Sequence, residues 1–156
     1  YGDPDPDRTP RLGVVSFNLA GLEHGLVAAV LNDYHNVAVR NGCFCAHPYV
    51  RELLKPELWE LDLDPDAGDA AATLKPWQGM VRASLGLYTV DEDIDALLAG
   101  IRDLLARPDD YRALYAIDAD GDFHHRTFHA PAKALFDPER ALDRALARLS
   151  APGAVS

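Results

Sequence analysis

The sequence predicts an α+β fold in which helices cover one face of a small sheet. Short segments rich in β-branched and aromatic residues alternate with longer segments whose apolar residues recur every three to four positions. A hairpin signal follows in the last third of the chain. With 48% hydrophobic and 26% charged residues, the 156-residue chain has enough apolar material for one ordinary core. These observations together favour a layer of helices packed on a sheet.

The first part of the chain predicts a strand, a helix, a second strand and a short helix. The segment Arg11 to Leu19 is short, β-branched and soon followed by a glycine, which is typical of a strand. Leu22 to Tyr34 carries one apolar stripe at helical spacing, and Asn36 to Arg40 returns to strand character. An irregular run with two cysteines then leads into a short helix expected around Tyr49 to Leu54.

A long surface excursion separates this part from the next strand. Between Lys55 and Pro76 the periodicity disappears and Asp, Pro and Gly accumulate, which favours a loop. Gly79 to Gly86 then predicts a third strand. Thr89 and Glu92 fit a capping box at the start of an amphipathic helix, which we expect Pro108 to end.

The last third of the chain predicts a hairpin and a closing helix. The segments Tyr111 to Ile117 and Phe123 to Phe128 flank an Asp-Gly turn, which is a hairpin signal. Pro138 to Leu149 has its apolar residues on one side of a helix. The predicted order is therefore strand, helix, strand, loop, strand, helix, hairpin and helix.

The charge balance argues against several classes of partner. With 15 Lys plus Arg against 25 Asp plus Glu, the net charge is -10 at pH 7. Such a surface repels phosphate backbones and anionic lipids, so we expect neither nucleic acid nor a membrane surface as partner. Polar residues or proline interrupt every hydrophobic run before the ~18–20 residues that a membrane span requires. Two cysteines are too few for the disulfide framework of a small secreted domain, and we predict a cytoplasmic protein.

Cys45 is the first candidate for chemistry, because it lies in a polar loop between a predicted strand and a short helix. Such a position can expose a thiol, and Arg40, Arg51 and the helix start favour its thiolate form, which is the nucleophile. The competing interpretation is a buried cysteine that acts as a small apolar residue, which composition alone favours.

Arg82 is the second candidate, because a charged residue in the middle of a predicted strand must face water or be paired. A guanidinium held on a strand suits bidentate binding of a carboxylate or phosphate. A structural ion pair with one of the many aspartates is an equal alternative. The residues by themselves do not separate the two.

Three further patterns resemble binding sites, but simpler explanations are favoured. Cys43, Cys45 and His47 could bind a soft metal, although a structural zinc site needs four ligands and no second cysteine pair exists. The acidic run from Asp118 to Asp122 lacks the closing glutamate of a calcium loop, which favours a hairpin turn. The three histidines within residues 124–129 fall on both faces of a predicted strand, which favours solvated side chains.

Two motifs resemble those of a known enzyme family. The run from Arg40 to Pro48 (RNGCFCAHP) fits an Arg-x-Gly-x-x-Cys-Ala-x-Pro pattern, and the run from Val81 to Thr89 (VRASLGLYT) leads into an acidic helix start. In this order they are similar to the class V pyridoxal-phosphate-dependent aminotransferases, within them most to the cysteine desulfurase and selenocysteine lyase branch. The resemblance covers roughly Arg11 to Leu105. It implies the small C-terminal domain of a fold-type I enzyme.

The resemblance implies roles for three residues. Cys45 would be the nucleophile that takes sulfur or selenium from the cofactor-bound amino acid, forming a persulfide and releasing alanine. Arg82 would hold the α-carboxylate of the substrate, and Arg40 would support the same pocket. Cys43 occupies a position that the motif leaves open.

The resemblance also implies a partner domain. In this family pyridoxal phosphate is held on a lysine of a large N-terminal domain, and Lys55, Lys75 and Lys133 lack the sequence expected around such a lysine. We therefore expect residues 1–10 to be a linker from a missing N-terminal domain. Residues 11–156 would form the small C-terminal domain, inactive alone, of an enzyme that acts on a small amino acid as a homodimer.

Two alternatives stay open. In the first, the chain belongs to a class V transaminase or to another pyridoxal-phosphate-dependent lyase or epimerase. In the second, it is a stand-alone module that uses Cys43 and Cys45 to carry a persulfide or a metal. A free-standing module should close its own core, whereas a fragment should show an apolar face left by the missing domain.

Overall fold

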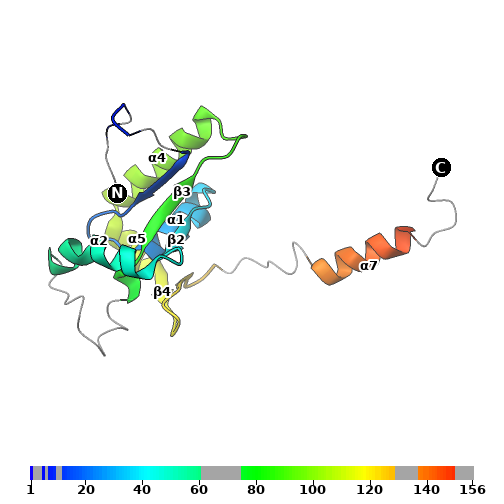
Figure 1. Cartoon of the computed structure of the whole chain (residues 1–156). Helices are drawn as coiled ribbons and strands as arrows, with labels where there is room; N and C mark the ends of the chain where they lie inside the picture. Colours follow the sequence, from blue (N-terminus) through cyan, green and yellow to red (C-terminus); the bar gives the residue numbers. More distant parts are fainter. Residues whose placement is uncertain (2–4, 6, 10–11, 61–74, 129–136, 150–156) are drawn as a thin grey trace. The chain divides into compact units, whose positions relative to one another are not determined.

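Three short strands form an antiparallel sheet in the order β1-β3-β2 (Figure 1). β1 spans Val14–Phe17, β2 spans Arg40–Gly42 and the central β3 spans Met80–Ser84. Two more strands form a separate hairpin. Small antiparallel sheets combined with helices confirm the predicted α+β class.

The computed structural model describes residues 1, 5, 7–9, 12–60, 75–128 and 137–149. The chain divides into two compact units, Tyr1–Arg126 and Thr127–Ser156. Both sheets belong to the first unit.

β2 begins at Arg40 and not at Asn36, because the turn that ends the preceding helix involves the first of the residues predicted for this strand. Helix α1 spans His24–His35, and Asn36 ends it with a left-handed φ of 54°. The backbone N–H of Val37 then donates to the carbonyl of Leu31 at 3.0 Å, which satisfies a carbonyl at the helix end. Sheet pairing starts only after this turn.

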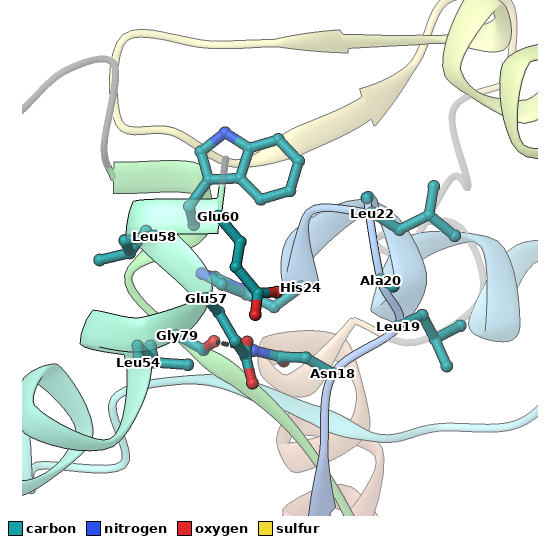
Figure 2. A pocket seen from close by; sticks show the side chains of 12 residues that line it. Asn18, Leu19, Ala20, Leu22, His24, Leu54, Glu57, Leu58, Glu60 and Gly79 are labelled. Carbon is teal, nitrogen blue, oxygen red and sulfur yellow. Dashed lines mark hydrogen bonds between the residues drawn. The ribbon is translucent and has the colours of Figure 1, made fainter. Parts of the chain in front are cut away.

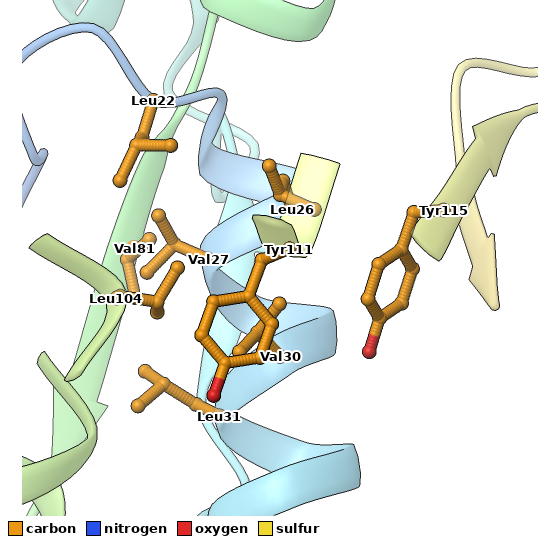
Figure 3. Packing of buried hydrophobic residues seen from close by; sticks show 9 residues of the cluster. All are labelled: Leu22, Leu26, Val27, Val30, Leu31, Val81, Leu104, Tyr111 and Tyr115. Atoms are coloured by element: carbon orange, nitrogen blue, oxygen red, sulfur yellow. The ribbon is translucent and has the colours of Figure 1, made fainter. Parts of the chain in front are cut away.

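The main hydrophobic core lies between β3 and the helices that cover one face of the sheet (Figure 3). α1 supplies four of its nine side chains, more than any other element, because the apolar residues of this helix recur at helical spacing. Helix α4, Asp91–Ala106, packs along α1. We call this set of buried residues the α1 core: Leu22, Leu26, Val27, Val30, Leu31, Val81, Leu104, Tyr111 and Tyr115.

α1 and α4 approach each other closely at Gly100, which is buried. A Cβ atom at this position would lie 2.7 Å from Cδ2 of Leu31 and 3.0 Å from Cγ of His35. Carbon atoms in a packed interior do not come that near. The contact between the two helices therefore depends on the missing side chain.

The N-terminus of α4 differs from the predicted capping box of Thr89 and Glu92. The carboxylate of Asp93 accepts a hydrogen bond from the backbone N–H of Val90 at 3.0 Å. The hydroxyl of Thr89 instead accepts one from the N–H of Gly86 at 2.9 Å. The helix thus begins one residue later than predicted, because the threonine stabilises the preceding turn.

A further helix, α2, packs on the other side of β3. It spans His47–Glu60. Side chains alternate along a strand, so Met80, which contacts α2, and Val81, which lies in the α1 core, face opposite sides of the sheet. We call the buried residues on this side the α2 cluster: Val50, Leu54, Leu58 and Met80.

α2 is longer than the predicted short helix. Its C-terminal part includes the first residues of the loop predicted from Lys55 to Pro76. It continues to Glu60 because Leu54 and Leu58 are both buried at four-residue spacing. The first residues of the predicted loop are therefore helical. The end of the excursion enters a 3-10 turn, η1, at Lys75–Trp77, and the part between lies outside the described residues.

Pro108 ends α4 as predicted, and it also starts a further helix. Helix α5 spans Pro108–Leu114, with proline in its first turn and two aspartates directly after it. The strand predicted to begin at Tyr111 is therefore wrong in its first half, because these residues favour a helix start. β4, Tyr115–Ile117, and β5, Phe123–His125, form the predicted hairpin.

Polar contacts attach α5 and the hairpin to α1 and the loop before it. The hydroxyl of Tyr115 donates to Asp33 at 2.8 Å, and that of Tyr34 lies 2.9 Å from Nε2 of His125. Arg112 donates to the carbonyl of Gly21 at 2.8 Å. α5 and the hairpin are therefore an integral part of the first unit.

Helix α7 spans Pro138–Leu149 in the second unit, with the bounds that the sequence predicts. The carboxylate of Asp137 accepts hydrogen bonds from the backbone N–H groups of Glu139 and Arg140, both at 3.1 Å. This is an N-cap, which satisfies two of the free donors at the helix start. None of the described helices combines the length and apolar character needed to cross a membrane.

Candidate functional site

Two arginines lie opposite each other across β2 and β3. The register pairs Arg82 with Arg40 on one side and with Ser16 of β1 on the other. Directly opposite residues of antiparallel strands point to the same face, with Cβ atoms ~4.5–5.5 Å apart, and like charges in this arrangement repel each other. Within the described part of the chain, neither arginine forms an ion pair with a carboxylate. This face of the sheet is therefore suited to an anion.

Arg82 is half-buried, and its side chain is only partly satisfied. Its guanidinium carbon lies 5.0 Å from the ring centroid of Phe44, within the range of a cation–π contact. Its Nε is buried and has no hydrogen-bond partner among the described residues. A buried donor of this kind lowers stability unless a ligand accepts from it. A carboxylate or phosphate would supply the acceptor.

Cys45 lies in a tight turn directly before α2. The backbone N–H of Ala46 donates to the carbonyl of Cys43 at 2.8 Å, which closes a four-residue turn. The two central residues, Phe44 and Cys45, have φ values of 53° and 63°. Two successive positive φ values are the pattern of a type I′ turn, which normally selects Asn or Gly. The turn exposes Cys45 to solvent, so the competing interpretation of a buried apolar cysteine does not apply.

Cys43 has a different environment. Its thiol donates a hydrogen bond to the carbonyl of Gln78 at 2.8 Å, and its side chain packs against the α2 cluster. Burial raises the pKa of the Cys43 thiol, and the positive charge of Arg51 opposes this only in part. The structure thus separates a half-buried thiol, whose thiolate form burial disfavours, from an exposed one two residues away.

The weaker patterns in the sequence do not gather metal ligands. In the described ranges, no group of three or more His, Cys, Asp or Glu residues could hold a metal ion. One carboxylate oxygen of Asp118 accepts from the N–H groups of Asp120 and Asp122, at 2.9 and 3.0 Å. The other lies 2.7 Å from Nε2 of His124. These contacts form the predicted hairpin turn, while His129 lies outside the described residues.

A pocket of about 440 Å³ lies between the loop after β1 and the second half of α2 (Figure 2). Leucines of the α1 core and the α2 cluster form much of its apolar wall. Asn18, His24, Glu57 and Glu60 supply polar groups. None of the three site residues that the sequence predicts lines this pocket.

Hydrogen bonds hold the polar side of the pocket together. The amide of Asn18 donates to the carbonyl of Gly79 at 3.0 Å and to the hydroxyl of Tyr1 at 3.2 Å. That hydroxyl donates to Glu57, and burial together with Glu57 raises the pKa of Tyr1 above its usual range. The buried Oδ1 of Asn18 has no partner among the described residues. Sequence reasoning could not find this group, because its members come from three distant segments.

His24, the first residue of α1, also has no role in the sequence interpretation. Its Nδ1 lies 3.2 Å from Oδ1 of Asn41, and burial lowers the pKa of its imidazole. A Cβ atom on Gly79 would lie 2.4 Å from its Nε2, so the backbone of the neighbouring strand passes very close. His24 therefore packs between β2 and the residue before β3, where burial disfavours its charged form.

The described lysines do not form a cofactor site. Lys55 pairs with Glu52 at 2.9 Å on α2, and Lys75 is exposed in η1. A lysine that binds a cofactor as a Schiff base lies in a pocket, where burial changes its protonation. Neither of these two lysines lines the pocket of Figure 2, and Lys133 lies outside the described residues.

Known proteins match most of the first unit. The family model described as "Aminotransferase class-V" matches residues 4–97. The chain is similar to a protein named cysteine desulfurase from Yersinia pseudotuberculosis serotype O:1b, with 33% identity over 94 residues, which are 60% of this chain and 18% of that protein. It is also similar to a cysteine desulfurase from Escherichia coli O127:H6, with 31% identity over 102 residues, or 65% of this chain and 18% of that protein. The chain thus spans less than a fifth of these curated relatives.

Proposed function

The chain belongs to the class-V aminotransferase family, and from this premise we propose that it forms the small C-terminal domain of a larger cysteine desulfurase or selenocysteine lyase. In this proposal residues 1–10 link it to an N-terminal domain, and the full enzyme is a homodimer. Relatives that are named cysteine desulfurases support the branch. Their greater length supports the further domain.

One observation carries the proposed chemistry: an arginine pair that has no carboxylate partner among the described residues lies near an exposed thiol. Arg82 would bind the α-carboxylate of the substrate with its guanidinium, and Arg40, opposite it in the sheet, would add positive charge. The short loop from β2 carries Cys45, which is three residues beyond the end of that strand. The sheet therefore holds the substrate's carboxylate close to the loop that presents the nucleophile.

Cys45 is the proposed acceptor of sulfur or selenium. Its thiolate attacks the chalcogen of the substrate, so a new S–S or S–Se bond forms while the bond from the chalcogen to carbon breaks. The bonding electrons stay on the carbon, which takes up a proton, and the product is alanine. Solvent exposure of Cys45 suits this role, because the persulfide must later pass its sulfur to an acceptor.

Pyridoxal phosphate, which the family uses, does not fit the residues described here. Among them, neither Lys55 nor Lys75 lies in a pocket that could enclose the cofactor. When bound, the cofactor supplies the electron sink that such chemistry needs. We propose that the N-terminal domain holds it and that this chain is inactive alone.

Exposed apolar residues at one end of the sheet support contact with a further domain. The backbone N–H of Leu85, just after β3, donates to the carbonyl of Gly13, just before β1, so these two segments lie side by side. Large apolar side chains on them are exposed, up to full exposure at Leu87. The residues are Leu12, Val14, Val15, Leu85, Leu87, Tyr88 and Val90. Exposed apolar side chains on both faces of a sheet end are typical of a segment that another part of the protein covers.

The proposal is tested on the full-length gene product by assaying alanine and sulfide released from L-cysteine. We expect Cys45→Ala to abolish sulfide release, because no other exposed thiol lies in the described part of the chain. Cys43→Ala is the matched control and should keep most of the release, since Cys43 is half-buried and bonded to Gln78. Unchanged sulfide release in Cys45→Ala would contradict the persulfide role. Amino transfer to a 2-oxo acid without sulfide release would favour the class V transaminase.

A further inference from the structure

In the turn from Cys43 to Ala46, two non-glycine residues have a left-handed backbone conformation. Phe44 and Cys45 both have positive φ, where a Cβ atom crowds the backbone. Such conformations persist only where surrounding contacts enforce them, and they cluster at functional sites. The turn must therefore be held by contacts beyond its own hydrogen bond.

The side chain of Phe44 makes the contacts that can hold the turn. Its ring packs against the α2 cluster and also lies 5.0 Å from the guanidinium carbon of Arg82. Phe44 is thus held between a hydrophobic cluster and an arginine. Because Cys45 is the next residue of the same turn, the place of the ring and the direction of the thiol are linked through one peptide unit.

The contact with Phe44 leaves Arg82 able to bind an anion. An aromatic ring contacts the flat face of a guanidinium, whereas a carboxylate binds the N–H groups at its edge. An acidic partner in place of Phe44 would occupy those N–H groups. The buried Nε, which has no partner among the described residues, remains available to a ligand.

We propose that Phe44 is a positioning residue that couples carboxylate binding at Arg82 to the orientation of the Cys45 thiol. The inference rests on the proposed function and deepens it. A bound carboxylate neutralises the guanidinium and pulls it toward the ligand, which changes its contact with the ring. The turn transmits this change to Cys45, while Phe44 itself touches no substrate.

The coupling is measured on the chain without turnover, as the rate at which iodoacetamide alkylates Cys45, followed by mass spectrometry. Sodium propionate is the carboxylate probe, and sodium chloride at equal ionic strength is the control. We expect propionate to slow alkylation of Cys45 about threefold, because movement of the Phe44 ring with Arg82 turns the Cys45 thiol and makes it less accessible to the reagent. Phe44→Leu keeps an unbranched Cβ but loses the aromatic face, and it should abolish this slowing.

Two control variants keep the test specific. Phe44→Tyr retains the ring and should retain the slowing. Phe123→Leu removes a half-buried ring at the hairpin and should also retain it. Equal slowing in the wild type and in Phe44→Leu, or no slowing in the wild type, would overturn the proposal.

The full-length enzyme supplies a second readout. Phe44→Leu should raise KM for L-cysteine by about three- to tenfold, because Arg82 is then no longer held in position for the carboxylate. A merely structural role would lower the amount of active enzyme and leave KM unchanged, which would count against the coupling. Sulfide release that does not depend on Cys45 would contradict the proposed function, whereas the alkylation rates judge the coupling by themselves.

Discussion

The two faces of β3 differ in what covers them. The face of Val81 is closed by α1 and α4, and the side chains of the α1 core are almost fully buried. On the other face α2 covers Met80, while Arg82 and Arg40 keep no carboxylate partner among the described residues. The face of Val81 therefore contributes mainly to the stability of the fold, whereas the face of Arg82 carries the candidate site. Because side chains alternate along a strand, the short strand β3 contributes to both.

The largest difference in stability between the two faces of β3 is expected in the α1 core. Leu104 is 0% exposed, so Leu104→Ala leaves a cavity and should lower the free energy of unfolding by about 2–5 kcal/mol. Leu58→Ala, in the smaller α2 cluster, should have the smaller effect. Urea unfolding followed by circular dichroism measures both. A larger loss from Leu58→Ala would contradict the division between the faces.

The contact between α1 and α4 should respond to the addition of a single methyl group. Gly100→Ala places a Cβ atom 2.7 Å from Leu31, so we expect a loss of about 1–3 kcal/mol in spite of the better helix propensity of alanine. The same substitution in a Leu31→Ala background should cost less, because the neighbouring side chain is then smaller. Additive losses in the double variant would argue against steric contact as the cause.

A polar group beside the α1 core should make stability depend on pH. Hydrogen bonds from Tyr111 and Arg107 hold the pKa of the Asp103 carboxyl below its usual value of 3.8. A depressed folded pKa contributes stability above the unfolded pKa, and this contribution is lost as pH falls through the folded pKa. Asp103→Asn should therefore be less stable than the wild type at neutral pH. The difference in stability between the wild type and Asp103→Asn should shrink below pH 3.8. Thermal unfolding at several pH values measures this difference. A difference that stays constant with pH would contradict the role of the carboxylate.

The smallest effect on stability is expected on the candidate site itself. Arg82→Met removes a charge that faces another arginine and keeps much of the aliphatic volume, so stability should change by about 0.5 kcal/mol or less. Activity of the full-length enzyme should nevertheless fall by about a hundredfold or more, because the substrate carboxylate loses its partner. Arg102→Met, at an exposed position of α4, is the matched control for both measurements. Equal loss of activity in the two variants would argue against carboxylate binding.

Sequence periodicity predicted the elements whose formation depends on their own residues. α7 has the predicted bounds, because amphipathic spacing and an acidic cap coincide at its start. The start of β2 and the extension of α2 to Glu60 were not predictable in this way. The first depends on the left-handed turn at Asn36 that ends α1, and the second depends on tertiary burial of Leu58.

The candidate site, too, was only partly predictable from the sequence. The motif locates Cys45, Arg40 and Arg82 in the sequence, and the pairing of β2 with β3 places the two arginines opposite each other. The contact of Phe44 with Arg82 is invisible in the sequence, because it joins a turn to a strand about forty residues later.

The left-handed turn also restricts which residues can follow one another in this loop. β-branched side chains are strongly disfavoured at positive φ, so Val, Ile or Thr at the position of Cys45 would disturb the backbone as well as remove sulfur. Gly and Asn suit the backbone, and neither is a nucleophile. Random substitution at Cys45 would therefore tend either to preserve the loop without chemistry or to damage both, which makes a return to activity through another nucleophile at this position a rare evolutionary event.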